Sequence, residues 1–477
     1  MVLSDGFLVL PLLIAVLYAS VETVSDVYSR KNYQRKIDVD SNVQQPWRGQ
    51  TTLIFALLAV SLGLGNVLRL PYVIGEQGGG AFLLVYVAVL TLVVSPVLIA
   101  ELTLGSLGRS SPMGSIQWVA SLAGRDTRWR WIGALQAILA LSIASLMMVP
   151  AVLGAEASFY LYRGDWDAAS ANDIIDTLSA IDSADHLRVL AVLVALVVVA
   201  ALPGPQVVLF LAGWVILPLI LLMMYAGLGF AFDVGDIAAA NEWIFKYRPE
   251  QLTEAGIFSA ALAALSSLGA GVGVGLVFGS RSPEGLPLVR SVIAVAILDT
   301  AFMLVLAIII VAVTAAVDVE MVQGLALLVV SIPYATANLP TGELFGLVIM
   351  MSILLATVAA LIALIEPMVS ILRREFDVPR LLAMMIVALV LWVSGALMMS
   401  EPLARQTIDT WLVPVLVPFV LGVTALFAVW RVPRPILRGE KYREPFAVFY
   451  VWYVIARWLT PVFCFTLSVL ALLRLVL

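Results

Sequence analysis

Long apolar runs separated by short polar segments make up most of this chain. Twelve of them approach or exceed the length, about 18 residues, that a helix needs to cross the hydrocarbon core of a bilayer. Pro203-Gly204-Pro205 divides one long run into two helices, because proline removes a backbone donor and clashes with the preceding turn. The pattern predicts an all-α polytopic membrane protein with spans at about 7–28, 53–74, 81–107, 132–160, 188–203, 207–231, 256–279, 289–317, 344–372, 381–400, 411–430 and 447–473.

Composition and charge narrow the class of protein. Of 477 residues, 62% are hydrophobic and 12% are charged, whereas soluble domains have about 25% charged residues. A net charge of -5 spread over short loops does not offer the basic surface that nucleic acid requires. A single cysteine, Cys464, excludes an intrachain disulfide, and the single histidine, His186, falls in a predicted outside loop. With no readable nucleophile–base set, we expect neither an enzyme nor a nucleic-acid-binding protein, but a protein surrounded by lipid.

The distribution of Lys and Arg predicts the orientation. Loop 29–50 is basic, and most other basic residues fall in loops on the same side by parity, whereas loop 161–187 on the opposite side is rich in aspartate. Because cytoplasmic loops carry an excess of Lys and Arg, the basic side should face the cytoplasm and both termini should lie outside. The expected location is the cytoplasmic (inner) membrane.

The first span, 7–28, admits two interpretations. It could be a cleaved signal peptide, but Asp5 stands where a basic n-region is typical, and the basic residues follow the apolar stretch. We therefore expect residues 1–50 to form a retained additional transmembrane helix and a basic cytoplasmic linker. This helix could stand in for a separate small subunit or for a missing last core helix.

Two spans carry glycine and polar residues at membrane depth. The second contains SLGLGNVLRLP over residues 61–71, and the seventh contains SSLGAGVGVG over residues 266–275. A broken helix is tolerated in hydrocarbon only where it lines a cavity or a ligand. For residues 266–275 taken alone, close helix packing through the small residues Gly271 and Gly275 is an alternative. Paired interruptions in two halves are typical of a secondary transporter with inverted repeats and a site near the bilayer midplane.

A 5+5 inverted-repeat organisation follows from this pairing. The transport core would cover about residues 51–430, with repeat one at about 51–231 and repeat two at about 256–430. A last core helix would occupy 431–477.

Several motifs follow one another at a recognisable spacing. These are Trp47, Gly63-Leu64-Gly65-Asn66-Val67-Leu68-Arg69-Leu70-Pro71, Gly78-Gly79-Gly80-Ala81-Phe82, Pro96 and Glu101-x-x-x-Gly105, with Glu366-Pro367-Met368 and Asp409-x-Trp411 further on. Their order and spacing resemble the neurotransmitter:sodium symporter family, whose best-known fold is that of the bacterial leucine transporter. The resemblance implies that fold, with eleven core helices plus one extra N-terminal helix.

The resemblance also implies a substrate site at the first interrupted helix. In the family, backbone amides there bind the substrate carboxylate, and they correspond to Leu64 and Gly65. Gly63 stands where monoamine carriers have aspartate, which favours a substrate that brings its own carboxylate, such as an amino acid. The remaining pocket positions correspond to Met148, Val152, Ser266, Gly269, Val272 and Leu364.

One sodium site is implied at Ser61, Asn66, Ser267 and Asp299, where Asp299 replaces the family's asparagine. A hard cation prefers such oxygens. Asp299 lies inside an apolar run, where an ionisable residue is a functional candidate. The alternative is a neutral, locally hydrogen-bonded aspartic acid that only packs the helix.

Other positions depart from the family pattern. The hydroxyl pair of the second sodium site falls at Ala359 and Ala360, so that site is doubtful. Met303 replaces the serine of chloride-dependent members, so no chloride requirement is expected. The extracellular gate pair is retained as Arg69 and Asp409. The inner-gate pair corresponds to Gln44 and Arg374, which cannot form an ion pair.

The leading hypothesis is a secondary active transporter of an amino acid or a related small carboxylate, driven by sodium at one site. Proton-coupled or ion-independent transport through Asp299 stays open, as does a non-transporting receptor or subunit. A channel is disfavoured because no ring of like charges is visible. A small subunit or a second copy could be a partner.

Overall fold

The computed structural model describes residues 49–62, 68–283, 285–317, 323–439 and 444–476. These residues are helical apart from turns and loops, and the isolated bridge between Gly79 and Tyr247 is the only extended pairing among them. The all-α prediction is therefore confirmed for the described chain. The predicted first span, 7–28, lies outside the described residues.

Nine helices among the described residues are long and apolar enough to cross a membrane. They agree with nine of the predicted spans. Their bounds are Gly80–Gly108, Thr127–Arg163, Ser183–Ala201, Ala212–Val234, Leu288–Ala315, Gly342–Glu375, Arg380–Ser400, Pro402–Arg431 and Phe446–Leu475.

The predicted second and seventh spans are the two interrupted ones. The second consists of α3 (Gln50–Ser61) and α5 (Leu70–Glu76), and the seventh consists of α15 (Glu254–Leu265) and α16 (Val274–Arg281). Pro71 is the second residue of α5. Proline suits the first turn of a helix, because the backbone N–H that it lacks would have no partner within the helix there. The break predicted at 266–275 is therefore real, whereas residues 63–67 of the other predicted break lie outside the described residues.

The helices between the breaks form the body of the first half. They are α6 (Gly80–Val89), α7 (Ser95–Gly108), α8 (Pro112–Leu122), α9 (Trp131–Arg163), α10 (Ala171–Ser179), α11 (Ser183–Ala201), α12 (Pro205–Leu211), α13 (Leu217–Val234) and α14 (Ile237–Phe245). The helix α11 ends before Pro203-Gly204-Pro205, as proline predicts. The loop predicted at 161–187 contains α10.

The second half continues after α16. Its helices are α17 (Leu288–Ala315), α18 (Ile332–Ala337), α19 (Gly342–Glu375), α20 (Arg380–Ser400), α21 (Pro402–Trp411), α22 (Val417–Leu426), α23 (Arg434–Arg438), α24 (Phe446–Val454) and α25 (Thr460–Val476). Single π-helical turns join α6 to α7, α12 to α13, α21 to α22 and α24 to α25. The helix predicted at 411–430 begins at Pro402, because the polar residues of α21 hide its helical continuation from an apolar-run search.

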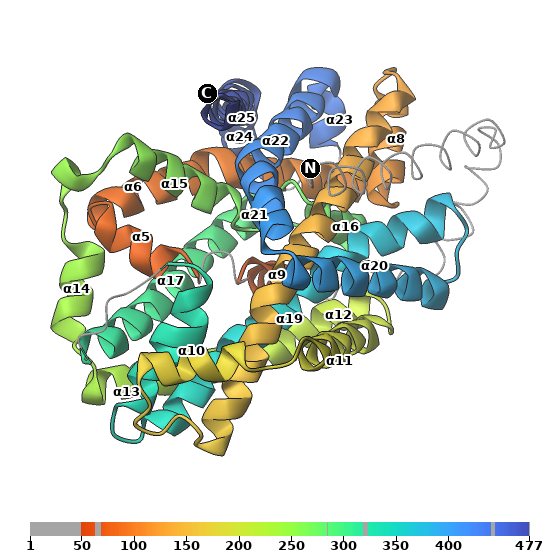
Figure 1. The fold of residues 1–477 in the computed structure, drawn as a ribbon. Coiled ribbons are helices and arrows are strands. Elements are labelled where there is room, and N and C mark those ends of the chain that lie inside the picture. The colour runs from red at the N-terminus through yellow and green to blue at the C-terminus, as the bar shows by residue number, and fades with distance from the viewer. Residues whose placement is uncertain (1–48, 63–67, 284, 318–322, 440–443, 477) are drawn as a thin grey trace.

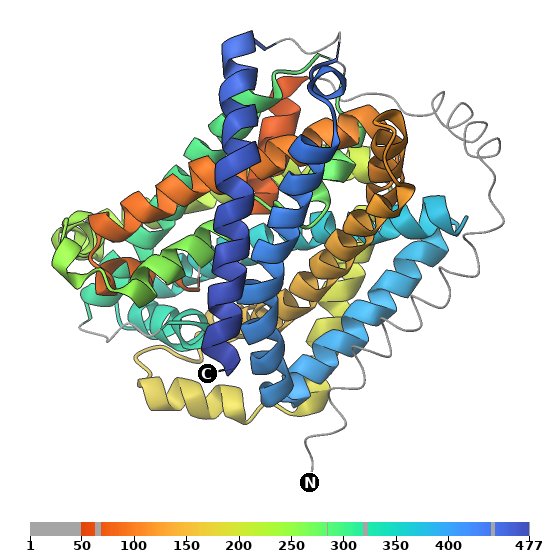
Figure 2. The same ribbon diagram turned by 90° about the horizontal axis from the view of Figure 1, so that it is seen from above.

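The two long helices α9 and α19 pack against each other in the middle of the molecule (Figure 1). The helix α7 packs against α16. The second contact needs glycine on both sides. A Cβ at Gly105 would lie 2.2 Å from the carbonyl oxygen of Leu276, and a Cβ at Gly279 would lie 2.2 Å from that of Leu102. The last helix, α25, lies along α22 at the periphery (Figure 2).

Candidate functional site

The segment between α15 and α16 leaves the helical path at residues 266–273. Four of these residues have positive φ, namely Leu268 at 48°, Gly269 at 62°, Gly271 at 78° and Gly273 at 74°. Glycine adopts this conformation without steric cost. Gly275 serves packing instead, since a Cβ there would lie 2.6 Å from a carboxylate oxygen of Glu101. The unwinding and the small-residue interpretations both hold, each for different glycines.

Asp299 of α17 faces this break. Its Oδ2 accepts a hydrogen bond of 2.7 Å from the hydroxyl of Ser267, and the Ser61 side chain also interacts with its carboxyl group. Asp299 is completely buried, and its Oδ1 has no hydrogen-bond partner among the residues that the structure describes. The structure therefore brings together three of the four predicted sodium ligands, at the point where α3 and α15 both end.

A buried carboxylate oxygen that lacks a hydrogen-bond partner is stabilised by a bound cation or by a proton. Leaving a buried charge unpaired is costly, and a bound cation or a proton would remove that cost. Serine and carboxylate oxygens are ligands that a hard cation accepts. The residues present therefore fit a sodium ion. The fourth predicted ligand, Asn66, lies outside the described residues together with Leu64 and Gly65.

Tyr86 is a residue of this cluster that the sequence interpretation missed. It lies on α6, is almost fully buried, and its hydroxyl is next to Ser267 and the charge of Asp299. Within the described residues, that hydroxyl makes no hydrogen bond of standard length. A tyrosine in an apolar helix gives no sequence signal of its own, because aromatic residues are common in such helices.

Glu101 of α7 holds the other side of the break. One of its carboxylate oxygens accepts hydrogen bonds from the backbone N–H of Gly271, at 3.0 Å, and from Nε2 of Gln136, at 2.7 Å. Nε2 of Gln136 also donates to the hydroxyl of Thr424 on α22, at 2.8 Å. A buried side-chain network thus replaces the helical hydrogen bonding that the unwound segment has lost.

The predicted pocket residues differ in exposure. Val152, Val272 and Leu364 are buried, whereas Ser266 is exposed and its hydroxyl donates to the carbonyl oxygen of Leu262, at 2.8 Å. Gly269 lies close to Val60, since an added Cβ would be 3.3 Å from it. The predicted Met148 is buried beside α20. A Cβ added at Gly395 of that helix would lie 3.4 Å from the Cβ of Met148.

The second sodium position has no side-chain oxygen at the two expected places. Ala359 and Ala360 are buried methyl groups, and the nearby hydroxyl of Thr357 donates to the carbonyl oxygen of Ile353 in its own helix, at 2.8 Å. A neighbouring cavity of about 10 Å³ is lined by residues that include Leu62 and Ala356. Such a cavity has room for one water molecule.

Arg69 and Asp409 come close but do not form an ion pair. Both are exposed, and the charge of Arg69 acts on Asp409 together with that of Arg405. Within the described residues, no carboxylate lies within 4.0 Å of the Arg69 guanidinium. The two predicted gate residues therefore interact through their charges, but they are not in direct contact as an ion pair.

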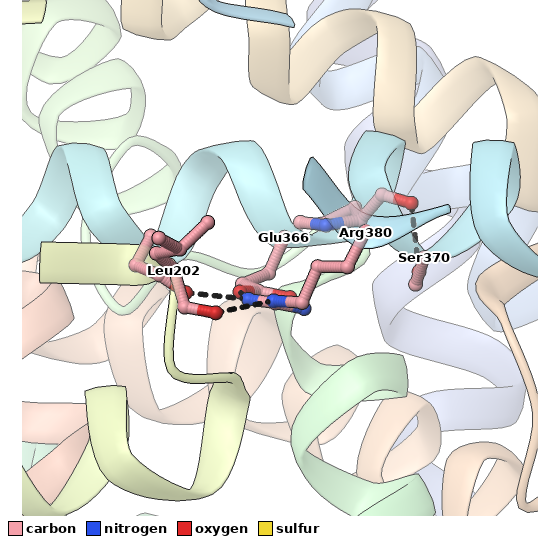
Figure 3. A network of polar contacts seen from close by, with 6 residues as sticks. Leu202, Glu366, Ser370 and Arg380 are labelled. Carbon is pink, nitrogen blue, oxygen red and sulfur yellow. Dashed lines mark hydrogen bonds and ion pairs between the residues drawn. The ribbon is translucent and has the colours of Figure 1, made fainter. Parts of the chain in front are cut away.

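At the opposite end, Arg380 joins three helices (Figure 3). It forms a buried ion pair with Glu366 of α19. It also donates to the carbonyl oxygens of Ala201, at 2.6 Å, and Leu202, at 3.1 Å, which end α11. Arg374, the predicted inner-gate position, donates to the carbonyl oxygen of Arg109, at 3.1 Å. Gln44 lies outside the described residues.

His186 corrects the expectation of a solvated loop residue. It lies in the first turn of α11, and its Nδ1 is 2.7 Å from Oε1 of Glu156 on α9. The loop interpretation failed because α11 begins at Ser183, before the apolar run that predicted its start.

Comparison with known proteins agrees with this geometry. The family model described as Sodium:neurotransmitter symporter family matches residues 44–164. An uncharacterized sodium-dependent transporter of Methanocaldococcus jannaschii is 23% identical over 428 residues, which are 84% of each chain. This chain is therefore similar to that family over residues 44–164, and to a sodium-dependent transporter over most of its length.

Two further proteins are similar to this chain, one over a short segment and one in its fold. A sodium-dependent neutral amino acid transporter, B(0)AT2 of Mus musculus, is 31% identical over 104 residues, or 22% of this chain and 14% of the mouse protein. The crystal structure of MhsT in complex with L-phenylalanine superposes with a TM-score of 0.77 at 22% identity, covering 90% of this chain and 99% of that one. The fold is therefore the inverted-repeat fold expected, in a multi-pass membrane protein whose relatives are transporters and not enzymes.

Proposed function

We propose that this protein is a sodium-coupled symporter of a neutral amino acid. The observation that carries the proposal is the hydrogen bond from Ser267 to Asp299 beside the unwound segment. Oδ1 of Asp299 is buried there and has no partner within the described part of the chain. A sodium ion there would be held by Asp299, Ser267, Ser61 and Asn66. The charge of the ion would compensate the buried carboxylate.

The substrate class rests on the surroundings of the break. Gly63 adds no acidic group near the backbone amides expected to bind a carboxylate, and Val152, Val272 and Leu364 add buried aliphatic surface. A carboxylate at one end and an apolar side chain at the other suit a neutral amino acid. The mouse protein is named as a neutral amino acid transporter and MhsT was solved with L-phenylalanine, which supports the same substrate class.

One ion per cycle is part of the proposal. Ala359 and Ala360 offer no hydroxyl at the second position, so coupling would depend on the Asp299 site alone. The alternative is a proton on Asp299, since a carboxyl group without a counter-charge can be neutralised by protonation.

Uptake into proteoliposomes separates these alternatives. An inward sodium gradient should drive accumulation of a neutral amino acid, a proton gradient alone should not, and Asp299→Asn should raise the sodium concentration for half-maximal uptake. Thr300→Val is the matched control, because the Thr300 hydroxyl donates to Ala296 of its own helix. Uptake driven by protons without sodium would replace the sodium proposal by the proton one. Unaltered ion and pH dependence in Asp299→Asn and Asp299→Ala would make the residue structural.

A further inference from the structure

A groove opens beside the first turn of α9, away from the site described above. Its volume is about 350 Å³. Apolar side chains of α9 and α22 form its walls, and the turn before α9 forms its mouth. The lining residues are Asp126, Arg128, Trp129, Trp131, Ile132, Leu135, Phe419 and Val423.

The mouth of the groove lies at a membrane interface. The apolar part of α9 starts at Trp131, directly after Arg130, and the span that contains α22 ends at Arg431. These two helices run in opposite directions by parity, so the start of one and the end of the other lie at the same side of the bilayer. Trp129, Trp131 and Trp430 are at this level, where tryptophan is enriched in membrane proteins.

The mouth carries surplus positive charge. Arg125, Arg130 and Arg431 have no acidic side chain within 4.0 Å among the residues that the structure describes, and the one acidic lining residue, Asp126, is paired with Arg128 at 3.8 Å. Two of these guanidinium groups are held in place. Arg125 Nε donates to the carbonyl oxygen of Arg431, at 3.1 Å, and Arg431 lies 5.5 Å from the ring centroid of Trp129.

We propose that this groove binds an anionic phospholipid. The phosphate would lie among Arg125, Arg130 and Arg431, and one acyl chain would lie between α9 and α22 against Leu135 and Phe419. Charge complementarity selects this occupant, because a zwitterionic lipid would leave the arginines uncompensated. A small soluble anion would leave the partly exposed apolar wall uncovered.

The bound lipid would pack beside the contact that fixes the unwound segment. Leu135 and Val423 line the groove, and the next residues in sequence, Gln136 and Thr424, are buried and hydrogen-bonded to each other at 2.8 Å. An acyl chain in the groove therefore holds α9 and α22 together at the level of that hydrogen bond. Occupancy should raise the thermal stability of the purified protein.

Lipid titration with native mass spectrometry tests the proposal. The full-length protein is purified in detergent and titrated with phosphatidylglycerol or phosphatidylcholine, and the retained lipids are counted. Arg125→Gln with Arg130→Gln removes charge at the mouth, and Val423→Phe narrows the groove without changing charge. Arg163→Gln with Arg188→Gln is the matched control. Arg163 is the last residue of α9, at the end away from the groove, and Arg188 lies near the start of α11; both are exposed.

The wild-type protein should retain one phosphatidylglycerol more tightly than phosphatidylcholine and melt at a higher temperature with it. Arg125→Gln with Arg130→Gln should lower the affinity for phosphatidylglycerol about fivefold for each arginine removed. This follows from the roughly 1 kcal/mol that each basic residue contributes near an anionic headgroup. The control should bind like wild type, and Val423→Phe should weaken retention of phosphatidylglycerol. Equal retention of both lipids, or equal retention by the mouth variants and the control, would mean non-specific surrounding lipid and overturn the proposal.

Discussion

Glu101 on α7 accepts a hydrogen bond from the backbone N–H of Gly271, 170 residues further along the chain. This bond ties a regular helix to the unwound segment that faces Asp299. It explains how glycine-rich backbone persists at membrane depth, where water cannot satisfy its polar groups.

Replacing Glu101 with alanine should destabilise the protein. The N–H of Gly271 and Nε2 of Gln136 would both lose an acceptor, and an unsatisfied buried donor costs about 1–3 kcal/mol. The melting temperature in detergent is the measurement. Thr103→Val is the control on the same helix, because the Thr103 hydroxyl donates to Ile99 of that helix. Equal melting temperatures for the two variants would show that Glu101 does not support the break.

Tyr86→Phe should weaken sodium binding without unfolding the protein. The ring stays in its buried position, and only the hydroxyl next to Ser267 and Asp299 is lost. If the hydroxyl contributes to the ion site about as much as one hydrogen bond, about 1 kcal/mol, the sodium concentration for half-maximal uptake should rise about fivefold. Tyr160→Phe on α9 is the control. An unchanged sodium dependence in Tyr86→Phe would exclude the hydroxyl from the ion site.

Restoring hydroxyl groups at the second sodium position tests the one-ion proposal. Ala359→Thr combined with Ala360→Ser should raise the Hill coefficient for sodium from about one toward two, because it supplies oxygens of the kind that a hard cation binds. Larger side chains in a packed core can cost about 1–3 kcal/mol, so the melting temperature is followed as well. A wild-type Hill coefficient near two would contradict the proposal directly.

Asp409→Asn should lower uptake at least tenfold and leave folding intact. Asp409 is exposed, so its charge contributes little to stability. In a closed state its pairing with Arg69 would be desolvated, where losing one partner is costly. Glu401→Gln is the control, because Glu401 is an exposed acidic residue that directly precedes α21, the helix that carries Asp409. Normal uptake by Asp409→Asn would remove the pair from the transport cycle.

Arg380→Gln should destabilise the protein by about 3–5 kcal/mol, because it leaves the buried carboxylate of Glu366 without a counter-charge. The double variant Glu366→Gln with Arg380→Gln should be more stable than Arg380→Gln alone. Thermal unfolding measures both, with exposed Arg373→Gln as the control. If the double variant is no more stable than the single one, the carbonyl contacts of Arg380 outweigh its ion pair.

The sequence by itself determined nine spans that the structure describes as long apolar helices, and the break within 266–275. Apolar length and the helix-breaking effect of Gly and Pro are local properties, so 61–71 and 266–275 were found without any knowledge of packing. Asp299 was also readable, because an acidic residue in an apolar run stands out. The repeat boundaries and the role of residues 1–50 remain predictions.

Only the tertiary structure decided which ordinary residues meet at the site. Tyr86, Gln136 and Thr424 lie in apolar helices and look like packing residues in the sequence. Their roles depend on how α6, α9 and α22 are rotated and packed, which brings hydrogen-bond partners together across 288 residues in the case of Gln136 and Thr424. Hydrophobicity adds up along the local chain, whereas a hydrogen bond depends on the positions of two distant atoms, and only the folded chain fixes those.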